Sequence, residues 1–180
     1  MIRYESIGFR SVERKDIDQI RKEHNDGSVL LMLKDPFIVT ETNQEEWFKN
    51  ITGNKHNTVY CIFKDDPDEV IGVWKLQGLD MTNRNTEMGM EIFSNHRGKG
   101  FSLNCFRMIF KYVFETLNIH TLHAKIGEFN EASLKTAQRA GFRITGKIPE
   151  SLFRNGRYYD DIILAITFSD YMENIKPNVS

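Results

Sequence analysis

Apolar and polar positions alternate at the start of the chain, and the pattern then changes to a helical period. Residues 2–12 alternate loosely and predict a strand. Residues 13–22 place two isoleucines at helical spacing among charged residues and predict a helix. The short apolar run 28–33 is compatible with either a helix or a strand. The chain therefore opens with a strand followed by a helix.

One helix signal and three strand signals follow. Residues 42–45 have the sequence of a capping box, which predicts a short helix over about residues 43–50. Two runs rich in β-branched and aromatic residues, 58–63 and 69–79, are joined by Asp-Asp-Pro-Asp, which is typical of a hairpin turn. A third strand is expected over residues 87–93. These three strands predict an antiparallel meander.

The most regular periodicity comes after residue 100. Apolar residues recur every three or four positions there and predict a helix that ends near Leu117. A strand over 120–126 and a helix over 130–140 follow. Residues 142–167 then predict two long strands about Asn155-Gly156, the preferred pair for a two-residue hairpin turn. We expect the tail after residue 167 to be a short helix or coil.

The resulting order is β-α-α-β-β-β-α-β-α-β-β, which indicates an α/β (α+β) fold. The strand-loop-helix-strand unit in the middle needs a right-handed parallel crossover, whereas the hairpins on either side of it are antiparallel. We therefore expect a mixed, largely antiparallel sheet in a single domain of residues 1–180.

The loop between the strand 87–93 and the following helix has the properties of a phosphate site. Gly98 and Gly100 permit tight turns, and the first turn of a helix presents free N–H groups and the positive end of its dipole. A Walker loop is excluded because Lys99 is followed by glycine. A dinucleotide fingerprint is excluded because Leu103 stands where its third glycine would be.

Composition and charge narrow the class of protein. The 180 residues are 40% hydrophobic and 27% charged, with a net charge of −1, so a general nucleic-acid binder is not expected. Cys61 and Cys105 lack metal-ligand or redox spacing and are expected to pack, so no metal is predicted. With no apolar signal core or membrane-length apolar run, we expect a cytoplasmic protein without a membrane partner.

Charge is unevenly distributed along the chain. Residues 11–80 contain 14 Asp and Glu against 9 Lys and Arg, whereas residues 81–180 contain 10 against 13. The acidic part precedes the predicted phosphate loop, and the basic part contains it. The carboxylates that could attract a cation are Asp16, Asp18, Glu23, Asp26, Asp35, Glu41, Glu45 and Glu46.

Five short motifs in register resemble the GNAT superfamily of N-acetyltransferases. The resemblance is to the branch with ribosomal-protein N-terminal, spermidine and amino-sugar acetyltransferases, whose loop reads Arg/Gln-x-x-Gly-x-Gly/Ala; here Ser102 takes the last position. The motifs are Met88-Gly-Met-Glu-Ile92, Arg97-Gly-Lys-Gly-Phe101, Asn130-Glu-Ala-Ser133, Ala140-Gly-Phe142 and Asn155-Gly-Arg-Tyr-Tyr-Asp160. This resemblance implies the acyl-CoA N-acyltransferase fold, with residues 1–80 on the acceptor side, 81–167 on the acetyl-CoA side and 168–180 as a tail.

In this family acetyl-CoA lies where two neighbouring parallel strands separate. By resemblance, main-chain groups of the strand end bond the pantetheine arm, loop amides hold the pyrophosphate with charge added by Arg97 or Lys99, and an asparagine contacts the cofactor arm. Asparagine is also an ordinary helix N-cap, so that alternative stays open for Asn130. The predicted cofactor-binding residues are Ile92, Phe93, Arg97, Gly98, Lys99, Gly100, Phe101, Ser102 and Asn130.

Acetyl transfer needs a neutral amine, a donor for the oxyanion and a proton for the departing thiolate. Many relatives supply the proton from a tyrosine where this chain has Ala137, so we assign that role to Ser133, which is otherwise a helix-surface serine. Glu87 and Glu91 are the candidate bases, with histidines at 120 and 123 as weaker candidates. A water chain could also carry the proton from the amine.

The sequence predicts the first of the following three functions and leaves the other two as alternatives. The first is an acetyl-CoA-dependent N-acetyltransferase with a small cationic acceptor, a polyamine or an amino sugar. The second is a protein N-terminal acetyltransferase, and the third is a non-catalytic acyl-CoA sensor, suggested by Ala137. Long paired C-terminal strands also suit a homodimer.

Overall fold

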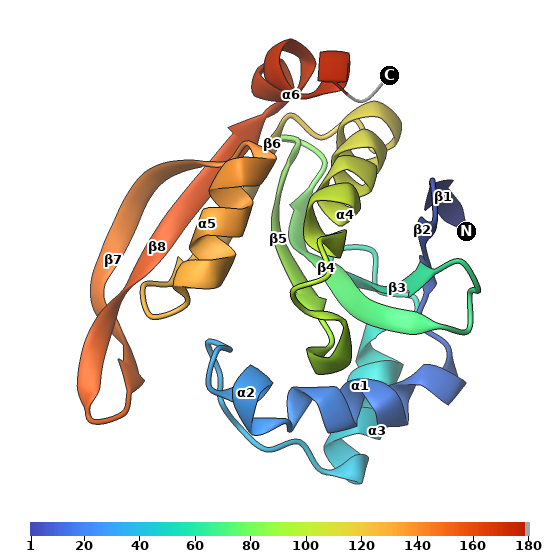
Figure 1. Cartoon of the computed structure of the whole chain (residues 1–180), viewed down its shortest axis with the longest axis vertical. Helices are drawn as coiled ribbons and strands as arrows, with labels where there is room; N and C mark the ends of the chain where they lie inside the picture. The colour runs from blue at the N-terminus through green and yellow to red at the C-terminus, as the bar shows by residue number, and fades with distance from the viewer. Residues whose placement is uncertain (179–180) are drawn as a thin grey trace.

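The computed structural model describes residues 1–178, and one eight-stranded sheet runs through them (Figure 1). Its strands lie in the order β1-β2-β3-β4-β5-β6-β8-β7. Among these described pairings β5–β6 is parallel and every other is antiparallel, so the predicted mixed sheet with one parallel crossover is confirmed. The strands are β1 (Ile2–Tyr4), β2 (Ile7–Ser11), β3 (Thr58–Lys64), β4 (Val70–Asp80), β5 (Asn85–Ile92), β6 (Thr121–Gly127), β7 (Arg143–Arg154) and β8 (Arg157–Thr167).

Helices cover both faces of the sheet. The helices α4 and α5 lie over one face, and α1 and α3 lie together below the lower ends of β4 and β5 in this view (Figure 1). Ile20 of α1 packs with Cys61 and Phe93 on the other face. This places the loop before α4 near the middle of the molecule. The helices are α1 (Ile17–His24), α2 (Gly27–Leu30), α3 (Glu41–Ile51), α4 (Phe101–Phe110), α5 (Glu131–Ala140) and α6 (Phe168–Asn174).

The main core lies between α4 and the sheet. The apolar stripe predicted from the sequence is buried in its middle: Phe110 and Val113 are fully enclosed and pack with Trp74 of β4 and Leu122 of β6 in one cluster. Truncating a buried phenylalanine such as Phe110 to alanine typically costs about 3–5 kcal/mol. This packing fixes α4, and with it the loop at its N-terminus.

A smaller cluster joins α1 to the other face of the sheet. Ile20 of α1 packs with Cys61 of β3 and with Phe93 just after β5, and Trp47 of α3 covers this group. Cys61 and Cys105 are buried and unpaired, and burial raises the pKa of each thiol to about 12. The cysteines therefore pack, as their apolar surroundings predict.

Two local predictions need correction. The first strand is a hairpin of β1 and β2, because Glu5 turns the chain with a φ of 54°. The capping box of α3 is formed by Thr40 with Asn43, two residues earlier than predicted, so this helix also begins earlier. Of the two alternatives left open for the apolar run 28–33, the structure has a helix, α2, at its start. The helix predicted to end near Leu117 does so, and its last part, Lys111–Thr116, is a π-helix.

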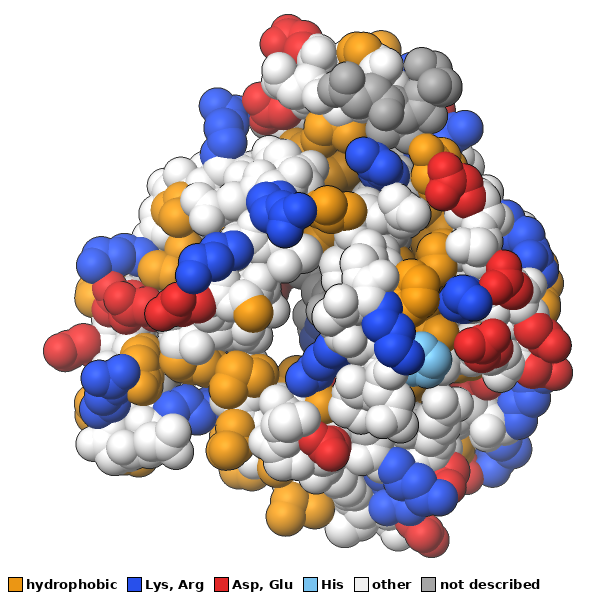
Figure 2. Space-filling view, in the orientation of Figure 1, with side chains coloured by type: hydrophobic (Ala, Val, Ile, Leu, Met, Phe, Trp, Pro, Cys, Tyr) orange, Lys and Arg blue, Asp and Glu red, His pale blue; other side chains and the backbone are white. Residues whose placement is uncertain are grey.

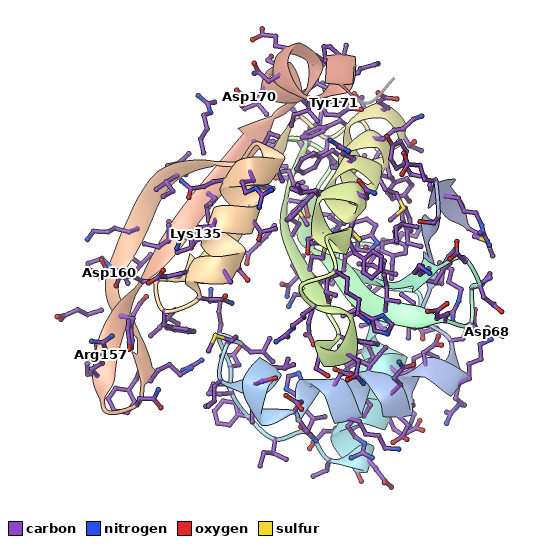
Figure 3. The ribbon with its side chains drawn as sticks, in the orientation of Figure 1. Asp68, Lys135, Arg157, Asp160, Asp170 and Tyr171 are labelled. Atoms are coloured by element: carbon purple, nitrogen blue, oxygen red, sulfur yellow. The ribbon has the colours of Figure 1, made fainter. Side chains whose placement is uncertain are left out.

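The C-terminal hairpin forms as predicted. Asn155 and Gly156 have φ angles of 49° and 82°, the positive values that a two-residue type I′ turn requires. The tail forms α6, from which the hydroxyl of Tyr171 donates a 2.8 Å hydrogen bond to Glu115 (Figure 3). Residues 179 and 180 of the predicted tail lie outside the described residues.

Candidate active site

The parallel strands β5 and β6 separate part of the way along their length. They pair at three positions, of which Glu87 with His123 is the last, although β5 continues to Ile92 and β6 to Gly127. Beyond that point β5 remains paired to β4, and β6 remains paired to β8. The sheet therefore divides, and main-chain groups of both strands face the gap. Figure 2 shows a hollow in this part of the molecule, with Lys and Arg side chains near its rim.

The predicted phosphate loop leads from β5 into α4 beside this gap. Gly98 and Gly100 have φ angles of 73° and 82°, and Gly100 is the residue before the helix. A Cβ at either position would meet no atom within 4 Å, so the left-handed backbone, and not space within the protein, requires glycine there. Among the described residues, the amides of 98–102 have no hydrogen-bond acceptor. These amides can bind an anion.

The end of β5 is held by protein hydrogen bonds. The amide of Phe93 donates to the carbonyl of Ile71 and its carbonyl accepts from His96, each at 2.9 Å. The Nε of Arg97 donates to the carbonyl of Ile92, also at 2.9 Å. The amide predicted to bond a cofactor arm at Phe93 is therefore engaged, and each carbonyl keeps one lone pair for a ligand.

The two candidate bases have different surroundings. Glu87 accepts a 2.9 Å hydrogen bond from Lys125 and lies 3.8 Å from His123. The pKa of Lys125 is raised by its hydrogen bond to Glu87, whereas burial lowers the pKa of His123. Because Oε2 of Glu87 already accepts a hydrogen bond from Lys125, this carboxylate is less available to an attacking amine.

Glu91 lies on the separated part of β5 and has no hydrogen-bond or ion-pair partner among the described residues. Burial raises the pKa of its carboxyl to about 6, against the opposing effect of Arg97 and Lys75 and with a smaller contribution from Glu23. A carboxyl with a pKa in that range suits a general base at neutral pH.

The residues of α5 combine a cap with an exposed serine. The side chain of Asn130 accepts a hydrogen bond from the amide of Ser133 at 3.2 Å, so Asn130 is the N-cap of this helix. Ala137, at the position of the family tyrosine, is 2% exposed in the core. Ser133 lies one turn earlier on the same helix face, beyond the packed region, and is exposed.

Two contacts on the acceptor side, made by Arg154 and by Lys34, involve residues that no sequence pattern indicates. Arg154 of β7 is 8% exposed and donates to the carbonyls of Leu31, Leu33 and Lys34 in the segment after α2. The ammonium of Lys34 lies 2.8 Å from the carboxylate of Asp161, which is 3% exposed. Together these contacts fix the segment after α2 to the C-terminal hairpin. Their partners lie more than a hundred residues apart, so no local sequence signal could have found them.

The tyrosines of the last hairpin follow strand alternation. Tyr158 is 64% exposed, whereas Tyr159 packs edge-on against Phe129 with ring centroids 5.3 Å apart. A cavity of about 400 Å³ borders both tyrosines. A second cavity, of about 250 Å³, lies where β5 and β6 part and is lined in part by Glu87 and His123.

Two features are absent from the described residues. Within residues 1–178 no group of three or more His, Cys, Asp or Glu side chains could hold a metal ion. No helix in that part of the chain is long and apolar enough to cross a membrane.

A parallel strand pair that opens beside an amide-lined loop is the arrangement expected of an acyl-CoA N-acyltransferase. A model of the family described as "Acetyltransferase (GNAT) domain" matches residues 6–143. The chain therefore belongs to the acetyltransferase (GNAT) family. This membership confirms the predicted resemblance, the fold, the enzyme class of N-acetyltransferase and acetyl-CoA as the acetyl donor.

Named relatives have different substrates. Spermidine N(1)-acetyltransferase of Vibrio cholerae is 26% identical over 92% of this chain and 95% of its own length. A putative ribosomal N-acetyltransferase of Bacillus subtilis is also 26% identical, over 87% and 88% of the two chains. The crystal structure of the Vibrio cholerae enzyme with CoA and spermine has a TM-score of 0.87 and 23% identity, and covers 94% of this chain and all of that chain. At this identity the structure shows the shared fold alone.

Proposed function

We propose that this chain transfers the acetyl group of acetyl-CoA directly to the primary amine of a small cationic acceptor, a polyamine or an amino sugar. The observation that carries this proposal is the separation of β5 from β6 beside a loop with free amides. Acetyl-CoA would lie with its pyrophosphate at residues 98–102 and its arm in the gap. A direct transfer follows, because both reactants can meet at the gap without a covalent intermediate on the enzyme.

Glu91 is the better of the two proposed bases. Its carboxyl is unpaired and faces the side of the sheet that carries the acceptor-side helices, whereas Glu87 is held by Lys125. In the proposed step, Glu91 takes a proton from the attacking amine as the C–N bond forms. Ser133 then donates a hydrogen bond to the departing thiolate, which lowers the barrier because negative charge grows on the sulfur.

Two considerations bear on the acceptor. Relatives named as spermidine acetyltransferases support a cationic small molecule. The excess of carboxylates in the first part of the chain is weaker support for a cationic acceptor, because many of them already form ion pairs within the protein. Asp16 pairs with Arg10 at 2.7 Å and Glu45 with Arg14 at 2.8 Å. Surface attraction of a cation would therefore be modest and would weaken with salt.

The rival functions each rest on one observation. A protein N-terminal acetyltransferase is favoured by the Bacillus subtilis relative. A non-catalytic acyl-CoA sensor is favoured by Ala137, since its methyl group cannot donate a proton. Release of CoA should be measured with spermidine, amino sugars, an amino-sugar nucleotide and N-terminal peptides. We expect turnover with a small amine; the highest kcat/KM with a peptide, or binding without turnover, would overturn the proposal.

We also infer that two copies associate through the C-terminal hairpin. β7 is an edge strand, and Ile144 and Ile148 on it are 54% and 44% exposed. One solved relative, from Vibrio cholerae, is described as dodecameric. Light scattering with size-exclusion chromatography should give at least a dimer, and Ile144→Asp should reduce it to a monomer. A wild-type monomer at micromolar concentration would refute this inference.

A further inference from the structure

Lys75 is a charged residue near the gap that has no role in the proposed reaction. It lies on β4 opposite Gly89 of β5, two residues past the last β5–β6 pair at Glu87. It shares its face of the sheet with Glu87 and Glu91, because alternate residues of neighbouring strands point the same way. This is the face on which the catalytic carboxyl is proposed to act.

The side chain of Lys75 lies across Gly89. A Cβ built on Gly89 would come within 2.8 Å of Cε of Lys75 and 3.3 Å of its Cγ. Any other residue at 89 would therefore displace this lysine. Because Cε lies over Gly89, the amine is one bond further on, at the part of β5 that borders the gap. The missing side chain of Gly89 therefore leaves the space in which the side chain of Lys75 lies.

The amine of Lys75 differs from its neighbours in having no direct partner. Lys125 binds Glu87 and Lys34 binds Asp161, whereas Lys75 has neither a hydrogen bond nor an ion pair among the described residues. The groups that face it are the carboxylates of Glu87, Asp35 and Glu91 and the ammonium of Lys34.

The protonation of these lysines also differs. Desolvation lowers the pKa of Lys75 in spite of the nearby carboxylates. The hydrogen bond with Glu87 raises the pKa of Lys125. A larger fraction of Lys75 is therefore neutral at a given pH, and only a neutral amine can attack a thioester.

We propose that Lys75 is an internal acceptor, so that the chain acetylates itself at this residue. The step uses acetyl-CoA as its only co-reactant and rests on the proposed function. The neutral Nζ of Lys75 forms a bond to the thioester carbonyl carbon, and the C–S bond breaks. The nitrogen loses one proton to the Glu91 carboxylate, and the sulfur leaves as a thiolate that is protonated to CoA. Lys75 becomes an N-acetyl amide.

The modification changes the charge of the acceptor side. It removes one positive charge that faces the carboxylates of Glu87, Asp35 and Glu91. Less of their negative charge is then neutralised. A cationic acceptor would bind such a surface more tightly, with a lower KM. Self-acetylation would thus prepare the site for its external substrate.

The test incubates the purified full-length chain with acetyl-CoA and no amine, and follows intact mass and peptide maps. We expect one acetyl group per chain, on Lys75, at a rate per chain that is independent of protein concentration. Lys75→Arg should abolish it, while Lys125→Arg, the matched control two strands away on β6, should leave it unchanged. Glu91→Gln should slow it by about 10²-fold, the lower end of what a general base contributes.

Four results would overturn self-acetylation. Acetyl groups spread over lysines other than Lys75 would indicate ordinary solution chemistry, and a rate proportional to protein concentration would indicate transfer between chains. CoA release with an added amine, together with an unmodified Lys75, would reject the internal acceptor and leave the proposed function standing. If calorimetry detects no acetyl-CoA binding, the proposed function itself fails, and self-acetylation fails with it.

Discussion

The raised pKa of Glu91 predicts opposite effects of one substitution on stability and on activity. Burial shifts this carboxyl from its ordinary pKa of 4.5 to about 6. The folded chain therefore binds the proton more tightly than the unfolded chain does. As the pH rises through this range the unfolded state loses its proton first, so the carboxyl makes the fold less stable at neutral pH.

The size of the effect follows from the shift. A difference between 4.5 and about 6 corresponds to about 2 kcal/mol of unfolding free energy, as an upper estimate because Glu91 is only half-buried. Glu91→Gln keeps the shape and removes the ionisation. We expect this variant to be more stable than wild type at pH about 8, by up to about 2 kcal/mol, and nearly equal to it at pH about 4.

The same substitution should damage catalysis. If Glu91 accepts the proton of the attacking amine, the glutamine variant should lose about 10²-fold or more in kcat. The wild-type kcat/KM should rise with pH through about 6, as the carboxyl loses its proton. Urea unfolding at the two pH values and CoA release as a function of pH are the measurements. A variant that is less stable at pH about 8, or one with wild-type turnover, would refute the assignment.

Three further substitutions test other parts of the site. Gly100→Val should abolish acetyl-CoA binding in calorimetry, because valine cannot adopt a φ of 82°; Gly146→Val, at a glycine with open space and no positive φ, should keep near-native affinity. Ser133→Ala should lower turnover by about 10²-fold with unchanged acetyl-CoA affinity, and wild-type turnover would leave it a surface serine. Arg154→Met, which frees the carbonyls of Leu31 and Lys34, should raise the KM for the amine more than it lowers kcat; an unchanged KM would remove Arg154 from the acceptor side.

Structural features that depend on residues close together in the sequence could be predicted. The period of α4, the Asn155-Gly156 turn and the loop around Gly98 each depend on residues close together in the chain, and each agrees with the structure. The cap of α3 shows the limit of such signals. Thr40 and Thr42 both start plausible caps, and the choice between them depends on which side chain reaches an amide three residues on.

The parts of the site that depend on strand register could not be predicted. The sequence places Lys75, Glu87 and Lys125 on three strands, but not which of them lie opposite one another. The sequence does not distinguish Glu87 from Glu91 as the base, whereas the ion pair between Glu87 and Lys125 in the structure does. Likewise, no sequence motif indicates the role of Arg154, because its partners are main-chain carbonyls.

The gap between β5 and β6 also has a mechanical consequence. Beyond Glu87 and His123, the sheet is two blocks, β1 to β5 and β6 to β8, joined at that end by no strand pairing within the described residues. A pantetheine arm lying in the gap would act as a ninth strand that ties the blocks together. Acetyl-CoA at about 100 times its Kd adds about 2.7 kcal/mol to stability. That gain should appear as slower amide hydrogen exchange on both rims of the gap, in residues 88–92 and 124–127.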